Sequence, residues 1–167
     1  MGHLLLTLSL VINTAAHAPP QQLALTGGTV ITATGQPPIE NTVVLVDGGR
    51  IVHVGARDAV TIPNEYRTID VTGKWITPGL IDSNIHLILM IVPEFYVKYE
   101  DRLADIAIQS AQVGLKYGLT TMPDTWGPLE PLLEARDRIN SGEFVGSRLL
   151  VAGNVICSTR TTASGSV

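Results

Sequence analysis

The feature that most constrains the fold is an alternation of apolar runs and helical patterns in the second half of the chain. A nearly continuous apolar stretch extends from about Trp75 to Val92, interrupted only by a short polar segment and a histidine. A strand this apolar is typical of a parallel sheet that helices cover on both faces. Helical patterns at 101–117 and 131–140 are each followed by a short β-prone run, at 119–122 and 148–156. Two successive βα units of this kind predict a parallel α/β sheet.

The first half of the chain has the pattern of short strands separated by turn residues. Between Leu23 and about Trp75, β-prone runs are broken by glycine, proline and aspartate. The runs Thr42–Val46 and Arg50–Val54 flank Asp47-Gly48-Gly49, whose glycines can adopt positive φ, and this predicts a β-hairpin. His53 lies in the second run, where a histidine on a strand is far more often exposed or half-buried than a ligand.

The N-terminus has the features of a secretory signal. An apolar run covers Leu4–Ile12, and the small-residue pattern Ala15–Ala18 follows it, so residues 1–18 are predicted to be a signal peptide. A buried N-terminal strand or helix is the alternative. The run is too short to span a bilayer, which takes about 20 residues. The signal predicts export to the periplasm or the outside of the cell.

The composition excludes some partners. There are 15 acidic and 11 basic residues, the net charge is −4, and no cluster of lysine or arginine is present. Nucleic-acid binding needs such a cluster to neutralise phosphates, so no nucleic-acid partner is expected. Cys157 is the only cysteine, so the chain cannot form an intrachain disulfide.

Three polar side chains interrupt the apolar run that follows Trp75. Asp82, Asn84 and His86 alternate along the sequence, so they would project to one side if this run stays extended. In a (β/α)₈ barrel, side chains at the C-terminal ends of strands form the active site, and two ligands at this spacing could reach one cation. As a bare pattern, the three residues favour packing or hydrogen bonding over metal binding.

Five segments in this order and spacing resemble the amidohydrolase superfamily, particularly its imidazolonepropionase-like and prolidase-like members. The resemblance extends from about residue 23 to residue 156. The segments are Gly27–Val30, Val46–Gly55, Asp70–Asp82, Tyr117–Asp124 and Gly146–Gly153.

The resemblance implies an α/β fold, with an N-terminal β-sandwich followed by the first strands of a TIM-type (β/α)₈ barrel that is incomplete in this chain. The expected domains are the signal at 1–18, the β-sandwich at 19–75 and the partial barrel at 76–167. The implied activity is metal-dependent hydrolysis of carbon–nitrogen bonds in a small-molecule amide or cyclic amide. The resemblance leaves oligomerisation open.

The resemblance also implies a metal site with an altered ligand. Family members usually carry His-x-His at the end of the first barrel strand, where both imidazoles bind a divalent metal, most often zinc. His86 matches the second histidine, whereas Asn84 occupies the first position, and an amide oxygen is a poorer zinc ligand than imidazole nitrogen. A subgroup with an altered or single-metal site, a binding protein that has lost catalysis, and a sequence error all fit this difference.

Other family ligands, namely a lysine or glutamate, two histidines and an aspartate from later strands, have no counterpart here. Metal binding is therefore expected to be weak or absent in this chain, with no turnover by the chain alone and poor solubility. The alternative function is a non-catalytic secreted binding protein or a degenerate pseudoenzyme. Asp124 resembles an acidic residue near the rim of the family's site, although a turn-capping role explains it equally well. Phe95, Tyr96 and Tyr99 could contact substrate, but packing at helical spacing is favoured.

Overall fold

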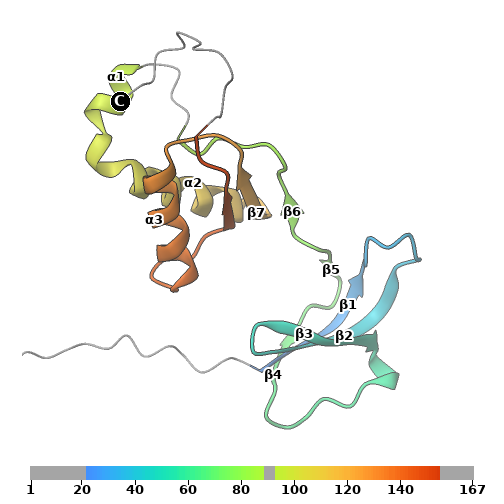
Figure 1. Ribbon diagram of the computed structural model, residues 1–167. Coiled ribbons are helices and arrows are strands. Elements are labelled where there is room, and N and C mark those ends of the chain that lie inside the picture. Colours follow the sequence, from blue (N-terminus) through green and yellow to red (C-terminus); the bar gives the residue numbers. More distant parts are fainter. Residues whose placement is uncertain (1–21, 89–92, 155–167) are drawn as a thin grey trace, which may run out of the picture. The chain divides into compact units, whose positions relative to one another are not determined.

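The computed structural model describes residues 22–88 and 93–154, and the chain divides between Thr77 and Pro78 into two compact units (Figure 1). The predicted signal peptide at 1–18 and Cys157 lie outside the described residues.

The first unit is built on one mixed sheet in the order β3-β2-β1-β4, with β5 also paired to β1. Its strands are β1 (Leu23–Val30), β2 (Ile39–Asp47), β3 (Arg50–Ala56), β4 (Arg67–Asp70) and β5 (Trp75–Ile76). β2 is antiparallel to β1 and β3, whereas β4 and β5 run parallel to β1. The predicted hairpin is confirmed, because β2 and β3 are joined through Gly48 and Gly49, with φ of 55° and 74°.

One face of this sheet is covered, and the other is exposed along its edge strand β3 although Val44 at its centre is buried. Ala24, Val43 and Leu45 are buried beneath a segment that follows the one-turn helix η1 (Arg57–Ala59). That segment contributes Val60, Ile62 and Tyr66. On the opposite face, apolar side chains of β1, β2 and β3 form two rows across the strands. One row is Leu25, Val44 and Val54, and the other is Leu23, Val46 and Ile51.

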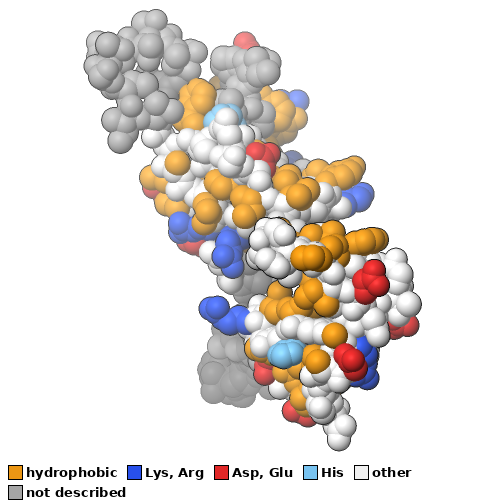
Figure 2. Space-filling model, turned by 90° about the vertical axis from the view of Figure 1, so that its right-hand side faces the viewer, with side chains coloured by type: hydrophobic (Ala, Val, Ile, Leu, Met, Phe, Trp, Pro, Cys, Tyr) orange, Lys and Arg blue, Asp and Glu red, His pale blue; other side chains and the backbone are white. Residues whose placement is uncertain are grey.

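This opposite face ends at the edge strand β3. Ile51 there is 67% exposed, and His53 is exposed as the strand pattern predicted. A second sheet, which a sandwich needs, is not among the described residues of this unit. Figure 2 shows that apolar side chains reach the surface over wide areas.

The second unit contains a three-stranded sheet in the order β6-β7-β8, and all neighbouring strands are parallel, as the alternation of strands and helices predicted. Its strands are β6 (Leu80–Ile81), β7 (Leu119–Asp124) and β8 (Arg148–Val151). Its helices are α1 (Pro93–Lys98), the short η2 (Glu100–Arg102), α2 (Leu103–Lys116) and α3 (Leu129–Asn140). Gly118 follows the end of α2 with φ of 87°, the left-handed conformation that glycine favours after a helix.

The core of the second unit lies between the sheet and helices α2 and α3. Met122 of β7 and Leu149 of β8 face this core, together with residues of both helices and of the segment after β6. The full set of buried core residues is Leu87, Ile88, Leu103, Ala107, Ile108, Ala111, Met122, Leu132, Ala135 and Leu149.

The opposite face of the sheet is not covered by these helices (Figure 1). Because side chains alternate along a strand, Pro123 and its neighbour Leu150 point away from the core, as do Thr121 and its partner Ile81. Ile81 is 65% exposed and Leu150 is 52% exposed. The expectation of a long first strand buried on both faces is therefore wrong for the described residues, because β6 has two residues and helices cover one face.

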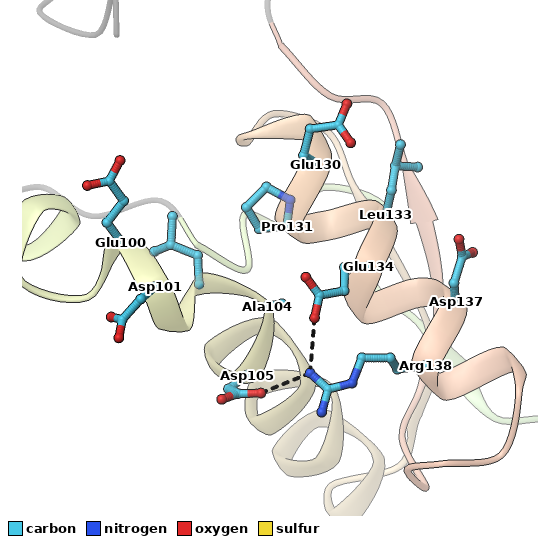
Figure 3. A pocket seen from close by; sticks show the side chains of 11 residues that line it. Glu100, Asp101, Ala104, Asp105, Glu130, Pro131, Leu133, Glu134, Asp137 and Arg138 are labelled. Carbon is cyan, nitrogen blue, oxygen red and sulfur yellow. Dashed lines mark hydrogen bonds and ion pairs between the residues drawn. The ribbon is translucent and has the colours of Figure 1, made fainter.

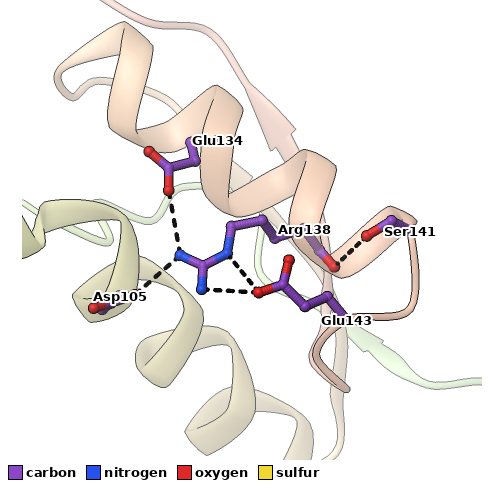
Figure 4. A network of polar contacts seen from close by, with 5 residues as sticks. All are labelled: Asp105, Glu134, Arg138, Ser141 and Glu143. Atoms are coloured by element: carbon purple, nitrogen blue, oxygen red, sulfur yellow. Dashed lines mark hydrogen bonds and ion pairs between the residues drawn. The ribbon is translucent and has the colours of Figure 1, made fainter. Parts of the chain in front are cut away.

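A charged cluster fastens α3 to α2 (Figure 4). The guanidinium of Arg138 contacts Asp105 of α2 at 3.0 Å, Glu143 at 3.0 Å and, one turn back along α3, Glu134 at 3.2 Å. Glu134 and Arg138 are four residues apart on α3, a spacing at which helical side chains meet. Each exposed pair of this kind contributes about 0.2–1 kcal/mol, so the cluster adds modestly to the stability of the unit.

Candidate functional site

The candidate site lies where the chain leaves β6 beside the end of β7. β6 ends at Ile81, and the Oδ1 of Asp82 accepts a hydrogen bond from the backbone N of Asn84 at 3.2 Å, which bends the chain. Pairing with β7 resumes at Ile85, which bridges to Asp124. The run is therefore not extended from Asp82 to His86, and the condition under which the three side chains would project to one side is not met.

Asn84 is exposed, and its side chain already has a partner. The Oγ1 of Thr125, directly after β7, donates a hydrogen bond to the Oδ1 of Asn84 at 2.7 Å. The amide oxygen that would serve as a ligand is thus held by a hydroxyl group. Thr125 was not singled out from the sequence, although its place just after the second barrel-like strand is the signal that could have identified it.

His86 is half-buried, and its ring meets the ring of Trp126 edge-on, with centroids 5.8 Å apart and planes at 85°. The Nδ1 of His86 is buried and has no hydrogen-bond partner. Buried polar atoms are nearly always hydrogen-bonded, so a ring nitrogen in this state is a candidate ligand atom. Sequence reasoning missed Trp126, which also follows β7 directly.

Asp124, the last residue of β7, is 1% exposed. Its Oδ2 accepts a hydrogen bond from the backbone N of Leu87 at 2.7 Å, and its Oδ1 accepts one from the backbone N of Trp126 at 3.2 Å. Burial raises the pKa of the Asp124 carboxyl, and the two backbone hydrogen bonds and the nearby His86 oppose that rise. The contact to Trp126 is the turn-capping bond considered from the sequence, and the contact to Leu87 adds a second role.

The aromatic residues after the first strand pack on one another. The rings of Phe95 in α1 and Tyr99 lie 4.3 Å apart, and the Nζ of Lys98 lies 5.1 Å from the centre of the Tyr99 ring. The side chain of Tyr96 lies outside the description. The described contacts agree with the packing role that helical spacing favoured.

One described side chain has an atom free to act as a metal ligand. The unpartnered, buried Nδ1 of His86 fits a ligand role, whereas the oxygen of Asn84 is engaged by Thr125. Within residues 22–88 and 93–154 no group of three or more His, Cys, Asp or Glu side chains could hold an ion. Zinc takes at least three protein ligands in catalytic sites, so the described residues do not form a complete zinc site.

The hollow between α2 and α3 is separate from this site (Figure 3). It has a volume of about 720 Å³, and six carboxylates and Arg138 line it, but His86, Asn84 and Asp124 do not. His86 instead lines a hollow of about 490 Å³ against α2, together with Gln109 and Val113 of that helix. Among the described helices, none has the length and apolar character to cross a membrane.

Comparison with known proteins found sequence relatives that are named as deaminases and imidazolonepropionases. No family model matches the chain. The 5-methylthioadenosine/S-adenosylhomocysteine deaminase of Symbiobacterium thermophilum is 42% identical over 67 residues, which are 40% of this chain and 15% of that protein. The imidazolonepropionase of Caulobacter vibrioides is 46% identical over 50 residues, 30% of this chain and 12% of that protein.

A solved structure extends the likeness over most of the chain. Molinate hydrolase superposes with a TM-score of 0.76 and 38% identity, over 84% of this chain and 31% of that one. The chain therefore spans about a third of the length of this structure and less of the sequence relatives. The sequence relatives and the shared fold agree, and the chain belongs to the amidohydrolase superfamily, a family of TIM-barrel proteins.

Proposed function

We propose that the protein to which this chain belongs is a metal-dependent hydrolase of carbon–nitrogen bonds in small molecules, such as amides and cyclic amides. The observation that carries the proposal is the 38% identity and TM-score of 0.76 with molinate hydrolase over 84% of the chain. The likeness to an imidazolonepropionase and to a deaminase supports the same bond class.

In this proposal, β6, β7 and β8 are the first strands of a (β/α)₈ barrel. The sheet is parallel, helices lie on one face, and the other face exposes Ile81 and Leu150. That arrangement suits a barrel wall, in which helices form the outer layer and the inner face is filled by side chains from other strands. A barrel closes with eight strands, so the remaining strands come from outside the described residues.

The β-sandwich is proposed on similar grounds. The first unit has one covered apolar face and a second that is exposed along β3, where Val54 and Ile51 are 37% and 67% exposed. Two sheets that pack face to face bury such a surface. The second layer would come from residues that the structure does not describe.

His86 is the proposed metal ligand of this chain, with Asn84 as a weaker oxygen ligand, and zinc is the proposed metal. A bound divalent metal would polarise a carbonyl group and supply a nucleophilic water at neutral pH. His86 would hold the ion through a ring nitrogen, and Thr125 would fix the orientation of Asn84. The described residues provide no further ligand set, so we expect them to give no turnover alone.

Export of the protein is a further part of the proposal, and it rests on the apolar run Leu4–Ile12 and the small residues after it. Sequencing the N-terminus of the protein recovered from the periplasm or medium tests it. A new N-terminus after Ala16 or Ala18 is expected, and an intact Met1 in the cytoplasm would contradict it.

The hydrolase proposal is tested on the protein purified from its source. Formation of the amine product from a panel of carbamates, ureas and N-acyl amino acids, and ring opening of cyclic amides, are measured before and after chelation and after adding back zinc. The variant His86→Ala should lower kcat/KM about 100-fold or more, since it removes a metal ligand. His53→Ala is the matched control, because His53 is exposed on β3 of the other unit. Activity that survives both chelation and His86→Ala would overturn the proposal.

A non-catalytic binding protein is the second candidate. It is favoured by the hydrogen bond that occupies Asn84 and by the absence of a three-ligand group among residues 22–88 and 93–154. Calorimetric binding of an amide from the panel, with no product formed in the presence of added metal, would support this candidate over the hydrolase.

A further inference from the structure

The backbone on both sides of His86 is fixed to the end of β7. Ile85 makes two ladder bonds, its N donating to the O of Pro123 at 3.4 Å and its O accepting from the N of Thr125 at 3.0 Å. In a regular parallel ladder, the next N–H on this side, that of Leu87, would donate to a backbone carbonyl of the neighbouring strand. It donates instead to the Oδ2 of Asp124 at 2.7 Å. A side-chain carboxylate thus takes the place of a main-chain acceptor.

This replacement lets β7 end while the segment with His86 stays attached to it. The same carboxylate accepts from the N of Trp126 at 3.2 Å, which turns the chain away after β7. The turn brings the ring of Trp126 against that of His86 in a T-shaped contact, with the centroids 5.8 Å apart. One carboxylate therefore fixes the backbone next to His86 and also the residue whose ring contacts it.

Both oxygens of this carboxylate are engaged and enclosed. Asp124 is 1% exposed, and each of its oxygens accepts a backbone hydrogen bond. Gly127 leaves the room it needs, because a Cβ at that position would lie 3.2 Å from the Oδ1 of Asp124 and 2.7 Å from the Cδ1 of Leu132. A group this enclosed cannot reach a substrate, so a direct role in proton transfer does not fit its geometry.

We propose that Asp124 is a positioning residue that holds His86 and Trp126 in the geometry of the site. The inference rests on the proposed function, in which His86 is a metal ligand. Partners that orient a ligating residue typically change metal affinity 10–100-fold when they are lost, without contacting the ion.

The substitution Asp124→Asn tests this role at almost constant size. An amide keeps one acceptor oxygen and turns the other position into an N–H donor, which would face the N–H of Leu87 or Trp126. One of the two backbone bonds is then lost. Asp70→Asn is the matched control, since Asp70 also accepts two hydrogen bonds, from the N and Oγ1 of Thr72, but lies in the first unit.

The readout is a fluorescence titration with Co²⁺ in a Trp75→Phe background of the full-length protein. The chain has two tryptophans, so this background leaves Trp126 as the one within it, and loss of the quenching in a Trp126→Phe variant identifies the signal of an ion bound at His86. Asp124→Asn should raise the Kd for Co²⁺ about 10–100-fold, whereas Asp70→Asn should leave it unchanged. Quenching that survives His86→Ala would contradict the proposed function itself. Quenching that needs His86 but is unaffected by Asp124→Asn would overturn only the positioning role.

A second measurement does not depend on the folding of a variant. In the unaltered protein, the amide hydrogens of Leu87 and Trp126 should exchange slowly with solvent, because the buried carboxylate holds them. The amide of Asn84, bonded to the side chain of Asp82 at an exposed turn, provides the comparison. If Leu87 exchanges as fast as Asn84, the carboxylate does not hold this segment and the proposal is wrong.

Discussion

Replacing Ile81 and Leu150 with serine should weaken self-association of the 167-residue chain. Both side chains lie on the sheet face that the helices leave open, and they are 65% and 52% exposed. Full burial of a leucine or isoleucine contributes about 1.5–3 kcal/mol, so each retains about 1–2 kcal/mol for association. A symmetric dimer through this face would bury two copies of each, about 4–8 kcal/mol as an upper bound. Even the lower value corresponds to roughly a 1,000-fold change in Kd.

Sedimentation velocity over a range of protein concentrations measures this change. The unaltered chain should associate, and the Ile81→Ser/Leu150→Ser variant should remain monomeric to much higher concentration. The control variant, Val97→Ser/Val145→Ser, removes two apolar side chains that are more exposed still, at 80% and 76%, but lie outside the sheet. A monomeric unaltered chain, or equal weakening by the control pair, would refute the reasoning that the open sheet face drives association.

Two further predictions concern the separate units. Gly79→Ala should destabilise the second unit by about 1–3 kcal/mol, because the added Cβ would overlap the side chain of Thr120, and a double-mutant cycle with Thr120→Gly in chemical unfolding should recover part of the loss. Asp70→Asn should reduce the dependence of the first unit's free energy of unfolding on pH in the acid range. Hydrogen bonds from the side chain and then the backbone of Thr72 lower the pKa of Asp70, so this stabilisation is present above its ordinary value of 3.8 and is lost as pH falls through the lowered pKa. Acid unfolding monitored by amide exchange in β1 and β4 should show the difference, and identical curves would count against it.

Much of the fold could be predicted from local pattern. Asp47-Gly48-Gly49 between two β-branched runs was enough for the β2–β3 hairpin, because the turn needs positive φ at its glycines. The helix over 103–116 followed from the spacing of apolar residues along the sequence. The extent of β6 could not be predicted this way, because an apolar run does not show which of its faces another layer covers.

The candidate site was less accessible from the sequence. His86 and Asn84 were named from their motif, but the bend at Asp82 that separates them from an extended strand was not foreseen. Thr125 and Trp126 were missed altogether. Each owes its role to a partner in another segment, Asn84 for Thr125 and His86 for Trp126, and no periodicity connects residues so far apart.

By itself, the sequence determined the local elements, their order and the family to which the chain belongs, because these depend on residue type and on spacing along a few turns or strands. The tertiary structure decided which polar groups meet. Asp124 and Leu87 are 37 residues apart, and Thr125 and Asn84 are 41 apart, yet both pairs form at the same strand ends. Parallel pairing of β6 with β7 brings these strand ends together. Because of that pairing, the buried carboxylate of Asp124 can accept the hydrogen bond from the N–H of Leu87 that a backbone carbonyl would otherwise accept.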